Sequence, residues 1–504
     1  MGFSSSLLQA SFVAASLFAS FVSADLISDL TGQHSFSVVV PGGAGYANAS
    51  QAFNLRYTFH PTAITFPSTP SDVSTILSLA SKYNHQAVAR SGGHSYIANG
   101  LGGKDGVLIV DLRNFNAITV DSKTNVASIG TGNRLGNVAL GLNAKGRALP
   151  HGTCPYVGIG GHSGHGGYGF TSRKWGLTLD TIVALDVVLA NGTIVTASQS
   201  NYPDLFWALR GSSSSFGIVT TVHANTFAAP SSATVFEYNW DLSASQAAAA
   251  TAAFQSFVVS SSLPQEFGAE LVLGAGSKKG RVSFGLTGGW YAPANQLAAV
   301  LAPYLKAVGV KPQSQTVTPG TYIESVGILG GLTGNRLNTS VAPDGHDTFY
   351  AKSLMTPEAQ PMSAKSLQAF YDYLGSTGFS ADSSWFVEIE LYGGFNSAIN
   401  NVPFDSTSFG KRNAMFTIQF YTSAPNNVPP FPQDGFSLLD GMVNSIVDNN
   451  PSNWDYGAYL NYIDDRLQNW QNLYYGSHYP KLEALKKQYD PEDVFKFPLS
   501  VEEK

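Results

Sequence analysis

The sequence predicts an α+β protein of two domains, the second of which is an antiparallel sheet covered by helices. Three observations support this fold class. The chain has 504 residues, enough for two or three domains of about 150 residues each. Apolar residues make up 43% and charged residues 12% of it, as in a packed globular protein. At about residue 230, short strands joined by glycine turns give way to longer helical patterns between isolated strands.

Residues 1–24 are expected to be a secretory signal peptide. An apolar run from Leu7 to Phe21 precedes Val22, Ser23 and Ala24, the small residues of a cleavage site. No later stretch of about 20 apolar residues is present, so we expect no membrane span. The net charge of −6 gives no electrostatic reason to expect nucleic acid as a partner.

Apolar spacing predicts the elements of the first domain in order. A helix is expected with Val73, Ile76 and Ala80 on one face and Ser71 as its N-cap. Further helices are expected near 135–142 and 203–210, with a loop at 212–215. Strands are expected at 86–89, 107–112, 118–121, 126–130, 181–189, 193–197 and 217–224.

Two turn signals and a change of pattern predict the remaining elements. Asn191-Gly192 between two strands predicts a type I′ hairpin turn. A proline-rich loop is expected at 425–432 and a final helix at 479–489. The second domain is expected to contain helices at 243–259, 295–308, 363–373 and 435–447, and strands at 269–273, 281–287, 385–392 and 415–421.

Sequons at Asn48, Asn191 and Asn338 agree with secretion and predict a glycoprotein.

The first domain is organised around a glycine-rich stretch, residues 151–170. It contains eight glycines, three histidines and the only cysteine of the chain. So many glycines are unfavourable for a stable helix or an ordinary strand. They leave main-chain N–H groups open to an anion, so a phosphate-bearing cofactor is expected here, with a glycine-rich turn between strands as the alternative. A second glycine turn, residues 90–96, is interpreted as another anion cradle.

The single cysteine, Cys154, cannot form an intrachain disulfide. A free thiol in an oxidising compartment should be either buried or chemically occupied. A metal site is an alternative use of Cys154 together with His151, His162 and His165. These residues lack a carboxylate and a helical i, i+4 pair, so we expect no metal.

The segments around the two glycine turns resemble a known family. Residues 90–95 and 151–155 are similar to the two flavin-linking segments of the FAD-linked oxidases of the vanillyl-alcohol oxidase (PCMH-type) family, berberine-bridge-like branch. Residues 207–211, 216–220 and 489–495 are also similar to family segments, so the resemblance covers nearly all of the mature chain. The secreted fungal glucooligosaccharide and chitooligosaccharide oxidases are the most similar in detail. Some of these relatives carry an additional disulfide that this chain cannot form.

The resemblance implies a PCMH-type FAD-binding domain at 25–230, a substrate domain at 231–454 and a C-terminal return to the FAD-binding domain at 455–504. It implies FAD linked through His94 to the 8α-methyl group and through Cys154 to C6. An imidazole and a thiol are nucleophiles that can add to a flavin, and the thioether would occupy the lone cysteine. The other expected cofactor contacts are Arg90, Ser91, Gly92, Gly93, Ser95, Gly152, Thr153, Val157, Gly158, Gly160, Gly161, His162, Gly167, Gly217, Ile218 and Asn461. Val157 matches a position beside the flavin where oxidases of this branch carry valine and dehydrogenases carry leucine.

Oxidation of an alcohol requires a base for the hydroxyl proton, and Tyr462 is the candidate. A tyrosine has a pKa of about 10 and needs a proton acceptor beside it. Glu390 stands where sugar-oxidising relatives have an aspartate that assists this tyrosine. In a strand at 459–462, Asn461 and Tyr462 would face opposite sides, one toward the flavin and the other toward the substrate.

Substrate contacts are expected from Tyr96, Glu270, Glu388 and Gln419. Glu388 and Glu390 share one face of a strand and are expected in the site, with a solvated sheet edge as the alternative. Gln419 resembles a family position that binds a sugar hydroxyl. Glu270 stands where relatives use Arg or Gln to select among oligosaccharides, which argues against copying their substrate.

These features predict a secreted flavoprotein oxidase that acts on the reducing-end C1 hydroxyl of an oligosaccharide and yields a lactone and hydrogen peroxide. The expected partners are the oligosaccharide and molecular oxygen, and the protein is expected to be a monomer. One alternative is a berberine-bridge-like oxidase of a non-sugar alcohol or alkaloid-type metabolite. Another is a carbohydrate-binding protein without turnover, which would have no need of the two glycine turns.

Overall fold

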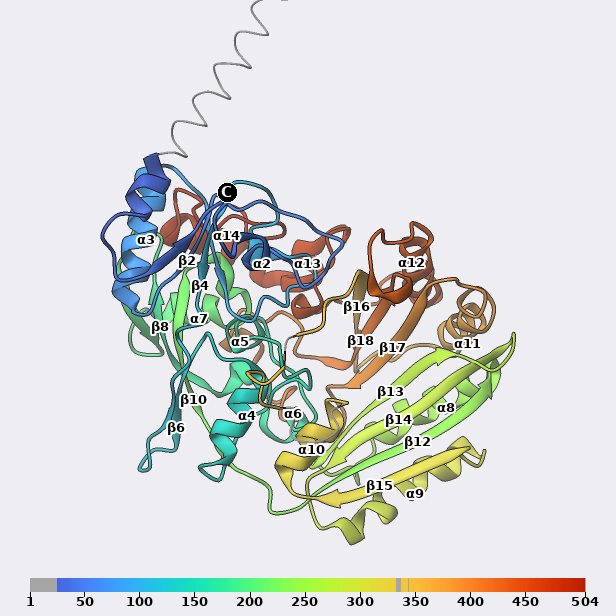
Figure 1. Ribbon diagram of the computed structural model, residues 1–504. Helices are drawn as coiled ribbons and strands as arrows, with labels where there is room; N and C mark the ends of the chain where they lie inside the picture. The colour runs from blue at the N-terminus through green and yellow to red at the C-terminus, as the bar shows by residue number, and fades with distance from the viewer. Residues whose placement is uncertain (1–24, 332–336, 343, 504) are drawn as a thin grey trace, which may run out of the picture.

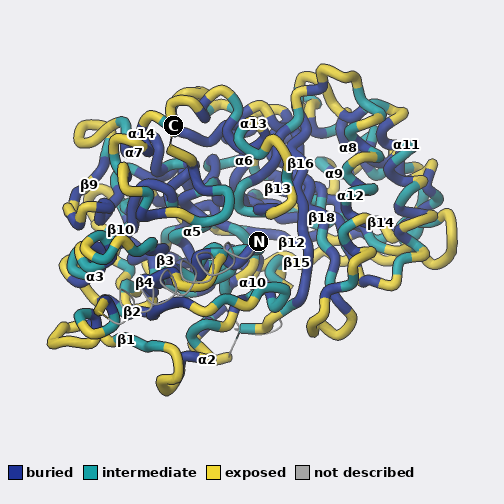
Figure 2. Tube along the Cα trace, turned by 90° about the horizontal axis from the view of Figure 1, so that it is seen from above, coloured by how far each residue is buried: buried dark blue, intermediate teal, exposed yellow. Residues whose placement is uncertain are grey.

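The computed structural model describes residues 25–331, 337–342 and 344–503, so the expected signal peptide lies outside the described residues. Two parts lie side by side: one contains the N-terminal elements as far as β11 (Phe227–Ala228) together with the C-terminal segment, and the other is a large sheet with its helices (Figure 1). Within the described residues, no helix combines the length and the apolar character that a membrane span needs. Buried backbone runs through both parts and through the region between them (Figure 2).

The first part contains small sheets, mixed and antiparallel. One sheet has the order β1 (Ser37–Val39), β2 (Ala63–Phe66), β4 (Leu108–Asp111) and β3 (Ala87–Arg90). A second has the order β5 (Ile118–Val120), β6 (Val126–Gly130), β10 (Ile218–Asn225), β8 (Ile182–Val188) and β9 (Ile194–Ser198). A further pair consists of β7 (Arg147–Ala148) and β11 (Phe227–Ala228). β2, β4 and β3 pair in parallel, whereas the other pairs in this part are antiparallel.

Short and medium-length helices surround these sheets. The α-helices are α2 (Tyr46–Ala49), α3 (Pro70–Lys82), α4 (Leu135–Asn143), α5 (Ile159–Gly164), α6 (Ser172–Trp175) and α7 (Pro203–Ser212). The 3₁₀ helices are η1 (Asn99–Leu101), η2 (Thr178–Thr181) and η3 (Ser213–Ser215). The loop expected at 212–215 is therefore the end of α7 followed by η3.

Helix α3 begins at a different cap from the one expected. Its N-cap is Thr69 and not Ser71. The Thr69 hydroxyl accepts from the Asp72 N–H at 3.1 Å, and the Asp72 carboxylate accepts from the Thr69 N–H at 2.9 Å. Pro70 occupies the first helical position, where its missing N–H costs nothing. This reciprocal capping box places the helix start before Ser71.

The hairpin between β8 and β9 is present, but its turn is not of type I′. A type I′ turn needs a positive φ at both central residues. Gly192 has a φ of 79°, whereas Asn191 does not have a positive φ. The Gly192 N–H donates to Leu189 O at 2.9 Å, so Gly192 is the left-handed residue that follows the central pair of the turn.

The glycine-rich stretch contains a helix, contrary to expectation. Helix α5 covers Ile159–Gly164. Its glycines are weak helix formers, but they allow neighbouring segments to approach. A Cβ at Gly160 would lie 3.2 Å from Ser91, and a Cβ at Gly164 would lie 2.6 Å from the Ser213 side chain. Tertiary packing thus stabilises a helix that propensity alone disfavours.

The second part is built on one seven-stranded sheet in which every neighbouring pair is antiparallel. The order is β15 (Ser314–Gly320), β12 (Ala233–Ser243), β14 (Arg281–Trp290), β13 (Phe267–Ala275), β17 (Ser384–Leu391), β18 (Ala414–Ser423) and β16 (Phe349–Pro357). The expected strands correspond to β13, β14, β17 and β18. Sequence reasoning missed β12, β15 and β16. β15 is exposed throughout and β16 is buried throughout, so neither shows the alternation of a half-buried strand.

Helices cover one face of this sheet. They are α8 (Ala244–Val258), α9 (Leu297–Val308), α11 (Ala364–Tyr373) and α12 (Asp434–Val447), with η5 (Leu374–Gly378) after α11. α10 (Tyr322–Leu329) packs instead against α4 of the first part, where Tyr322 and Val326 share a core with Ala139. The short η4 (Ala294–Gln296), η6 (Phe404–Ser406) and η7 (Pro425–Asn427) lie in connections between elements. Leu271, Ile389 and Ile418 of the sheet share a core with residues of α8, α9, α11 and α12. Because side chains alternate along a strand, Glu270 and Glu390 lie on the opposite face.

The C-terminal segment packs against the first part. It contains η8 (Leu460–Tyr462), α13 (Trp470–Tyr475), η9 (Gly476–His478) and α14 (Tyr479–Tyr489). Leu482 and Leu485 of α14 share a core with Leu205 and Leu209 of α7. Figure 1 shows α13 and α14 beside the N-terminal elements.

Arg173 of α6 joins the two parts. Its side chain is fully buried, and its guanidinium donates to four carbonyl oxygens, those of Pro264, Phe267, Gly393 and Phe395, at 2.6–3.0 Å. Burial lowers the pKa of Arg173 to about 10, so the guanidinium remains charged at neutral pH. A buried cation whose hydrogen bonds all go to main-chain oxygens fixes α6 against the ends of β13 and β17.

Candidate active site

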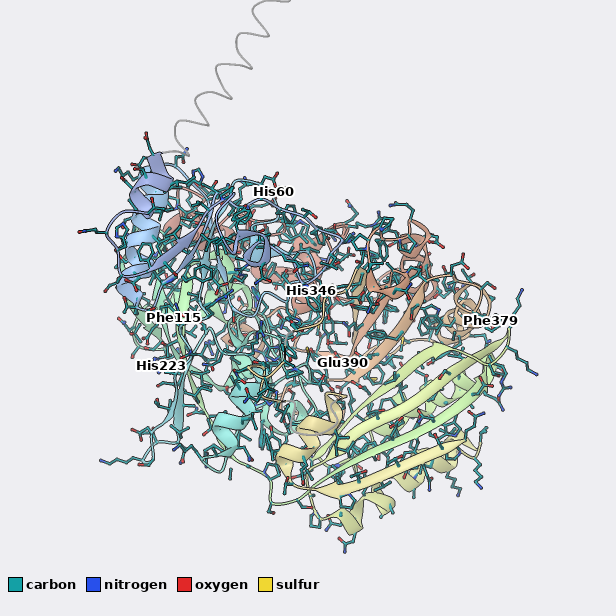
Figure 3. All side chains as sticks on the ribbon, in the orientation of Figure 1. His60, Phe115, His223, His346, Phe379 and Glu390 are labelled. Carbon is teal, nitrogen blue, oxygen red and sulfur yellow. The ribbon has the colours of Figure 1, made fainter. Side chains whose placement is uncertain are left out.

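A tyrosine and a glutamate from distant parts of the chain meet between the two parts of the molecule. The Tyr462 hydroxyl donates to Oε1 of Glu390 at 2.6 Å. Glu390 is only 4% exposed, and its Oε2 has no hydrogen-bond partner among the described residues. Figure 3 shows Glu390 near the centre of the molecule, where the large sheet faces the first part. The structure thus brings together the two residues expected to handle the substrate proton.

The segment that carries Tyr462 is not the strand expected at 459–462. Residues Leu460–Tyr462 form the 3₁₀ helix η8, closed by a 2.9 Å hydrogen bond from Tyr462 N to Tyr459 O. Four residues are too few for alternation to distinguish a strand from a turn. Asn461 and Tyr462 still have different partners, because successive residues of a 3₁₀ helix point about 120° apart. Asn461 Nδ2 donates to His162 O at 3.0 Å and to the Tyr459 hydroxyl at 2.9 Å.

Three carboxylates gather on the sheet face beside Tyr462. Glu270 of β13 lies directly opposite Glu390 of β17 in the strand register, and Glu388 precedes Glu390 by two residues. Their nearest oxygen atoms all lie within 4.8 Å of one another. Strand β17 lies between β13 and β18, so the alternative of a solvated sheet edge is wrong. Three acidic groups could approach a cation, but acidic groups alone do not define a metal site.

Burial raises the pKa of each of these carboxyl groups, and neighbouring charges raise the pKa of Glu270 and Glu390 further. Burial raises the pKa of Glu388 to about 7. Burial, followed by the charges of Glu388 and Glu390, raises the pKa of Glu270 well above the ordinary range. The pKa of Glu390 is also raised well above that range, by burial and by the charge of Glu388, against the lowering effect of the Tyr462 hydrogen bond. Ionisable groups so close together titrate as a set and not independently.

The remaining expected substrate residues lie beside these carboxylates. Gln419 of β18 is opposite Glu388 in the register, and its Nε2 donates to the Tyr96 hydroxyl at 2.5 Å. The Tyr96 ring stacks on the Tyr462 ring, with centroids 5.8 Å apart and planes 8° apart. Tyr96, Glu270 and Glu388 are half-buried. The face therefore offers a carboxamide, two phenols and three carboxyl groups, a set suited to hydroxyl-rich ligands.

His94 and Cys154 lie close to a common carboxylate, Asp344. His94 Nε2 is 2.5 Å from Asp344 Oδ2, and the His94 ring stacks on Phe53 with centroids 3.9 Å apart. The thiol of Cys154 was expected to be either buried or chemically occupied. Cys154 is exposed, so it is not buried. Partial desolvation raises the pKa of Cys154, and the negative charge of Asp344 raises it further. Sequence reasoning missed Asp344, because it lies in a segment without periodicity or a motif.

The glycine turns approach each other more closely than they could with side chains. A Cβ at Gly92 would lie 2.3 Å from Gly158 N, and the Gly160 N–H donates to Ser91 Oγ at 3.2 Å. A Cβ added at Gly161, by contrast, would have no neighbouring atom within 4 Å. Several expected cofactor glycines therefore serve loop packing, whereas the side of Gly161 that would carry a Cβ is unobstructed.

Other expected cofactor residues have protein partners. Arg90 donates to Asp111 Oδ2 at 2.6 Å in a buried ion pair, and its Nη2 has no partner among the described residues. The His162 Nε2 accepts from Gly152 N–H at 3.1 Å, and burial lowers the pKa of His162 to about 3. The other contacts of expected residues are Gly93 near the Arg90 side chain, Ser95 Oγ accepting from Asn99 N–H, Thr153 O near Gly330, Val157 O accepting from Leu135 N–H, Gly167 N–H donating to the Tyr459 hydroxyl, Gly217 against Val187, and Ile218 buried in β10.

Each histidine considered for a metal contacts a backbone group through one ring nitrogen. His151 Nδ1 lies 2.7 Å from Gly152 O, and His165 Nδ1 lies 2.9 Å from Gly161 O. Together with the His162 bond to Gly152, these contacts account for one nitrogen of each ring. The second nitrogen of His151 is buried without a partner in the described part of the chain. An exposed thiol, an oriented imidazole, the unobstructed side of Gly161 and this unpaired nitrogen fit a large polar cofactor such as FAD.

Comparisons with known proteins agree with this geometry. The family model for an FAD binding domain matches residues 61–198, and the model described as berberine and berberine like matches residues 458–502. The xylooligosaccharide oxidase of Thermothelomyces thermophilus is 36% identical over 89% of this chain and 89% of its own length. The chain belongs to the berberine-like FAD-linked oxidases.

Solved structures show that this berberine-like oxidase shares its whole fold with relatives. A chitooligosaccharide oxidase superposes with a TM-score of 0.88 at 33% identity, covering 96% of this chain and 100% of the other. The glucooligosaccharide oxidase of Acremonium strictum, which carries a 6-S-cysteinyl, 8α-N1-histidyl FAD, superposes with a TM-score of 0.86 at 34% identity, covering 95% and 99%. The prediction of a PCMH-type FAD enzyme is confirmed, and the alternative of a binding protein without turnover does not agree with this membership.

Proposed function

We propose that this berberine-like oxidase is secreted and converts the reducing-end C1 hydroxyl of an oligosaccharide to a lactone, with oxygen reduced to hydrogen peroxide. The observation that carries the proposal is the 2.6 Å hydrogen bond between Tyr462 and Glu390 on a sheet face rich in polar side chains. The relatives described above are oxidases of xylo-, chito- and glucooligosaccharides, which supports a sugar as the substrate.

The residues of the chain supply the path for the hydroxyl proton. Tyr462 Oη would accept the proton of the substrate hydroxyl while its own proton moves to Glu390 Oε1. Burial and the charge of Glu390 raise the pKa of Tyr462 well above its ordinary value, so a free tyrosinate is not the resting form. Tyr462 therefore acts together with the carboxylate. FAD, when bound, supplies the acceptor for the hydride that leaves C1.

The substrate would bind along the face formed by β13, β17 and β18. Gln419 and Tyr96 would hold sugar hydroxyls at the side of Tyr462. Glu388, with a pKa of about 7, can carry a proton near neutral pH, and burial also favours the protonated form of Glu270. A protonated carboxyl group both donates and accepts hydrogen bonds. Such groups suit the mixed donor and acceptor character of a sugar ring.

The flavin would be held by two covalent links, one to His94 and one to Cys154. The exposed thiol of Cys154 and the oriented ring of His94 lie near the same carboxylate, that of Asp344. The same pair of link types is present in the glucooligosaccharide oxidase of Acremonium strictum. Asn461, which bonds to the glycine-rich stretch through His162 O, would position η8 beside the flavin.

A hydrogen peroxide screen tests the proposal. The purified protein is incubated with xylo-, chito-, cello- and malto-oligosaccharides and, in separate wells, with non-sugar alcohols. A sugar whose oxidation gives one peroxide and one aldonic acid per turnover supports the proposal, and the Tyr462→Phe protein shows whether turnover depends on this site. Peroxide production from non-sugar alcohols alone would instead support the non-sugar alternative and overturn the sugar assignment.

A further inference from the structure

We propose that Asp344 prepares His94 for its covalent link to FAD by holding the proton on Nε2 and receiving it when the bond forms. The inference rests on the proposed link at His94 and adds a positioning residue that the sequence did not indicate. It concerns the attachment of the cofactor and not the oxidation of the substrate.

The geometry selects one nitrogen of the His94 ring. Nε2 lies 2.5 Å from Asp344 Oδ2, so the carboxylate is within hydrogen-bond reach of this nitrogen. Nδ1 has no hydrogen-bond partner in the part of the chain that the structure describes. A carboxylate acceptor at Nε2 keeps the proton there and leaves the lone pair on Nδ1. Nδ1 is therefore the nucleophilic nitrogen. In flavin nomenclature this is N1, the atom linked in the glucooligosaccharide oxidase of Acremonium strictum.

The ring is also held in orientation. Phe53 stacks on His94 with planes 26° apart, and the His94 side chain is 8% exposed. Asp344 makes no other hydrogen bond among the described residues, whereas the nearby Asp347 binds Tyr421 and Ser423 at 2.8 and 2.7 Å. Asp347 thus ties the segment before β16 to strand β18, whereas the carboxylate of Asp344 contacts His94.

The step balances with oxygen as the oxidant. The bond from Nδ1 to C8α forms while one C–H bond of the 8-methyl group breaks, and Asp344 takes the Nε2 proton from the alkylated ring. The ring and the methyl group each lose one hydrogen, and molecular oxygen takes both together with the electron pair as hydrogen peroxide. Without Asp344 the neutral ring would share its proton between the two nitrogens, and the alkylated ring would lack a nearby acceptor.

Flavin retention after denaturation tests the inference in a background with a single link. Cys154→Ala leaves His94 as the only attachment, and the flavin that stays in the pellet after acid precipitation measures that link. We expect Cys154→Ala to retain its flavin and Cys154→Ala with Asp344→Asn to lose nearly all of it. The rate of covalent incorporation into the apoprotein should fall roughly 10²-fold or more, as when an acid–base group is removed.

Three controls separate this role from a structural one. Asp344→Asn alone should keep flavin through Cys154, which shows that the variant folds and binds FAD. Asp344→Glu in the Cys154→Ala background should restore the link, and the matched change Asp347→Asn should leave it intact. Equal retention in Cys154→Ala with and without Asp344→Asn overturns the inference. Release of all flavin from Cys154→Ala alone overturns the His94 link itself and with it the inference.

Discussion

The Tyr462 hydroxyl and the Glu390 carboxylate form a 2.6 Å hydrogen bond that joins the C-terminal segment to a central strand of the large sheet. The second oxygen of Glu390 has no partner among the described residues. The carboxylate therefore keeps the capacity to receive a proton without breaking another hydrogen bond.

Replacement of Tyr462 by phenylalanine should slow flavin reduction by roughly 10²–10⁴-fold, the usual contribution of general base catalysis. The ring and its stacking on Tyr96 remain, and only the proton acceptor is lost. Anaerobic stopped-flow reduction by the substrate isolates this step from reoxidation. Tyr479→Phe, which removes a hydroxyl bonded to Glu502 and not to a residue of the site, is the matched control. If the Tyr462→Phe protein is reduced as fast as the wild type, the base is another group.

The pH dependence of flavin reduction should report the raised pKa of Glu390. The proton acceptor must be ionised, so the rate should rise with pH through a value above the ordinary range of a glutamate. Glu390→Gln should reduce the rate by less than Tyr462→Phe does. It should also abolish the rise of the rate with pH, which is the acid limb of the profile. Measurement of the reduction rate between pH 5 and 9 checks both points. An unchanged acid limb in Glu390→Gln would assign it to another group, with Glu388 the next candidate.

Each proposed flavin link should survive the loss of the other. His94→Ala should retain flavin through Cys154, Cys154→Ala should retain it through His94, and the double variant should release free FAD on denaturation. Flavin fluorescence of the denatured protein on a gel, together with peptide mass spectrometry, identifies the linked residue. Release of FAD from the denatured wild type would contradict the prediction for both residues.

Substitution of Val157 by leucine should slow the reaction of the reduced flavin with oxygen and spare flavin reduction. The side chain is half-buried against the cluster around Leu135, so the extra methylene would enter space beside the glycine-rich stretch. The two half-reactions are measured separately by stopped flow. Equal slowing of both would mean that Val157 is an ordinary packing residue.

The stability of the protein should fall as pH rises because Glu388 is desolvated in the folded state. The pKa of Glu388 rises from 4.5 to about 7 on folding, so between these pH values the folded state holds more protons than the unfolded state. Its free energy of unfolding then decreases with pH, by at most roughly 3 kcal/mol for a shift of this size. Glu388→Gln should flatten the dependence measured by urea unfolding at pH 5 and pH 8. The exposed Glu503→Gln serves as the control and should leave the slope unchanged.

The sequence predicted the α+β class and the residues that form the Tyr462–Glu390 pair, because both depend on local patterns and on motifs of the family. It did not predict that Glu270 lies opposite Glu390, since the register between β13 and β17 is set by packing over more than a hundred residues. The turn at η8 was also missed, because four residues cannot distinguish a strand from a 3₁₀ helix. Asp344 could not be found, because only the folded chain shows which aspartate of its segment meets His94.

The contacts of Arg173 limit how the large sheet can be exchanged between relatives. All four acceptors of its buried guanidinium are main-chain oxygens, so recognition between the two parts depends on backbone shape and not on the side chains at the boundary. A chimera that takes its large sheet from a relative could keep this junction even at low sequence identity. If the transplanted backbone were displaced, however, an unpaired cation would remain inside the protein and the chimera would not fold. Substrate preference is therefore better altered by grafting side chains onto the existing sheet than by exchanging the sheet as a module.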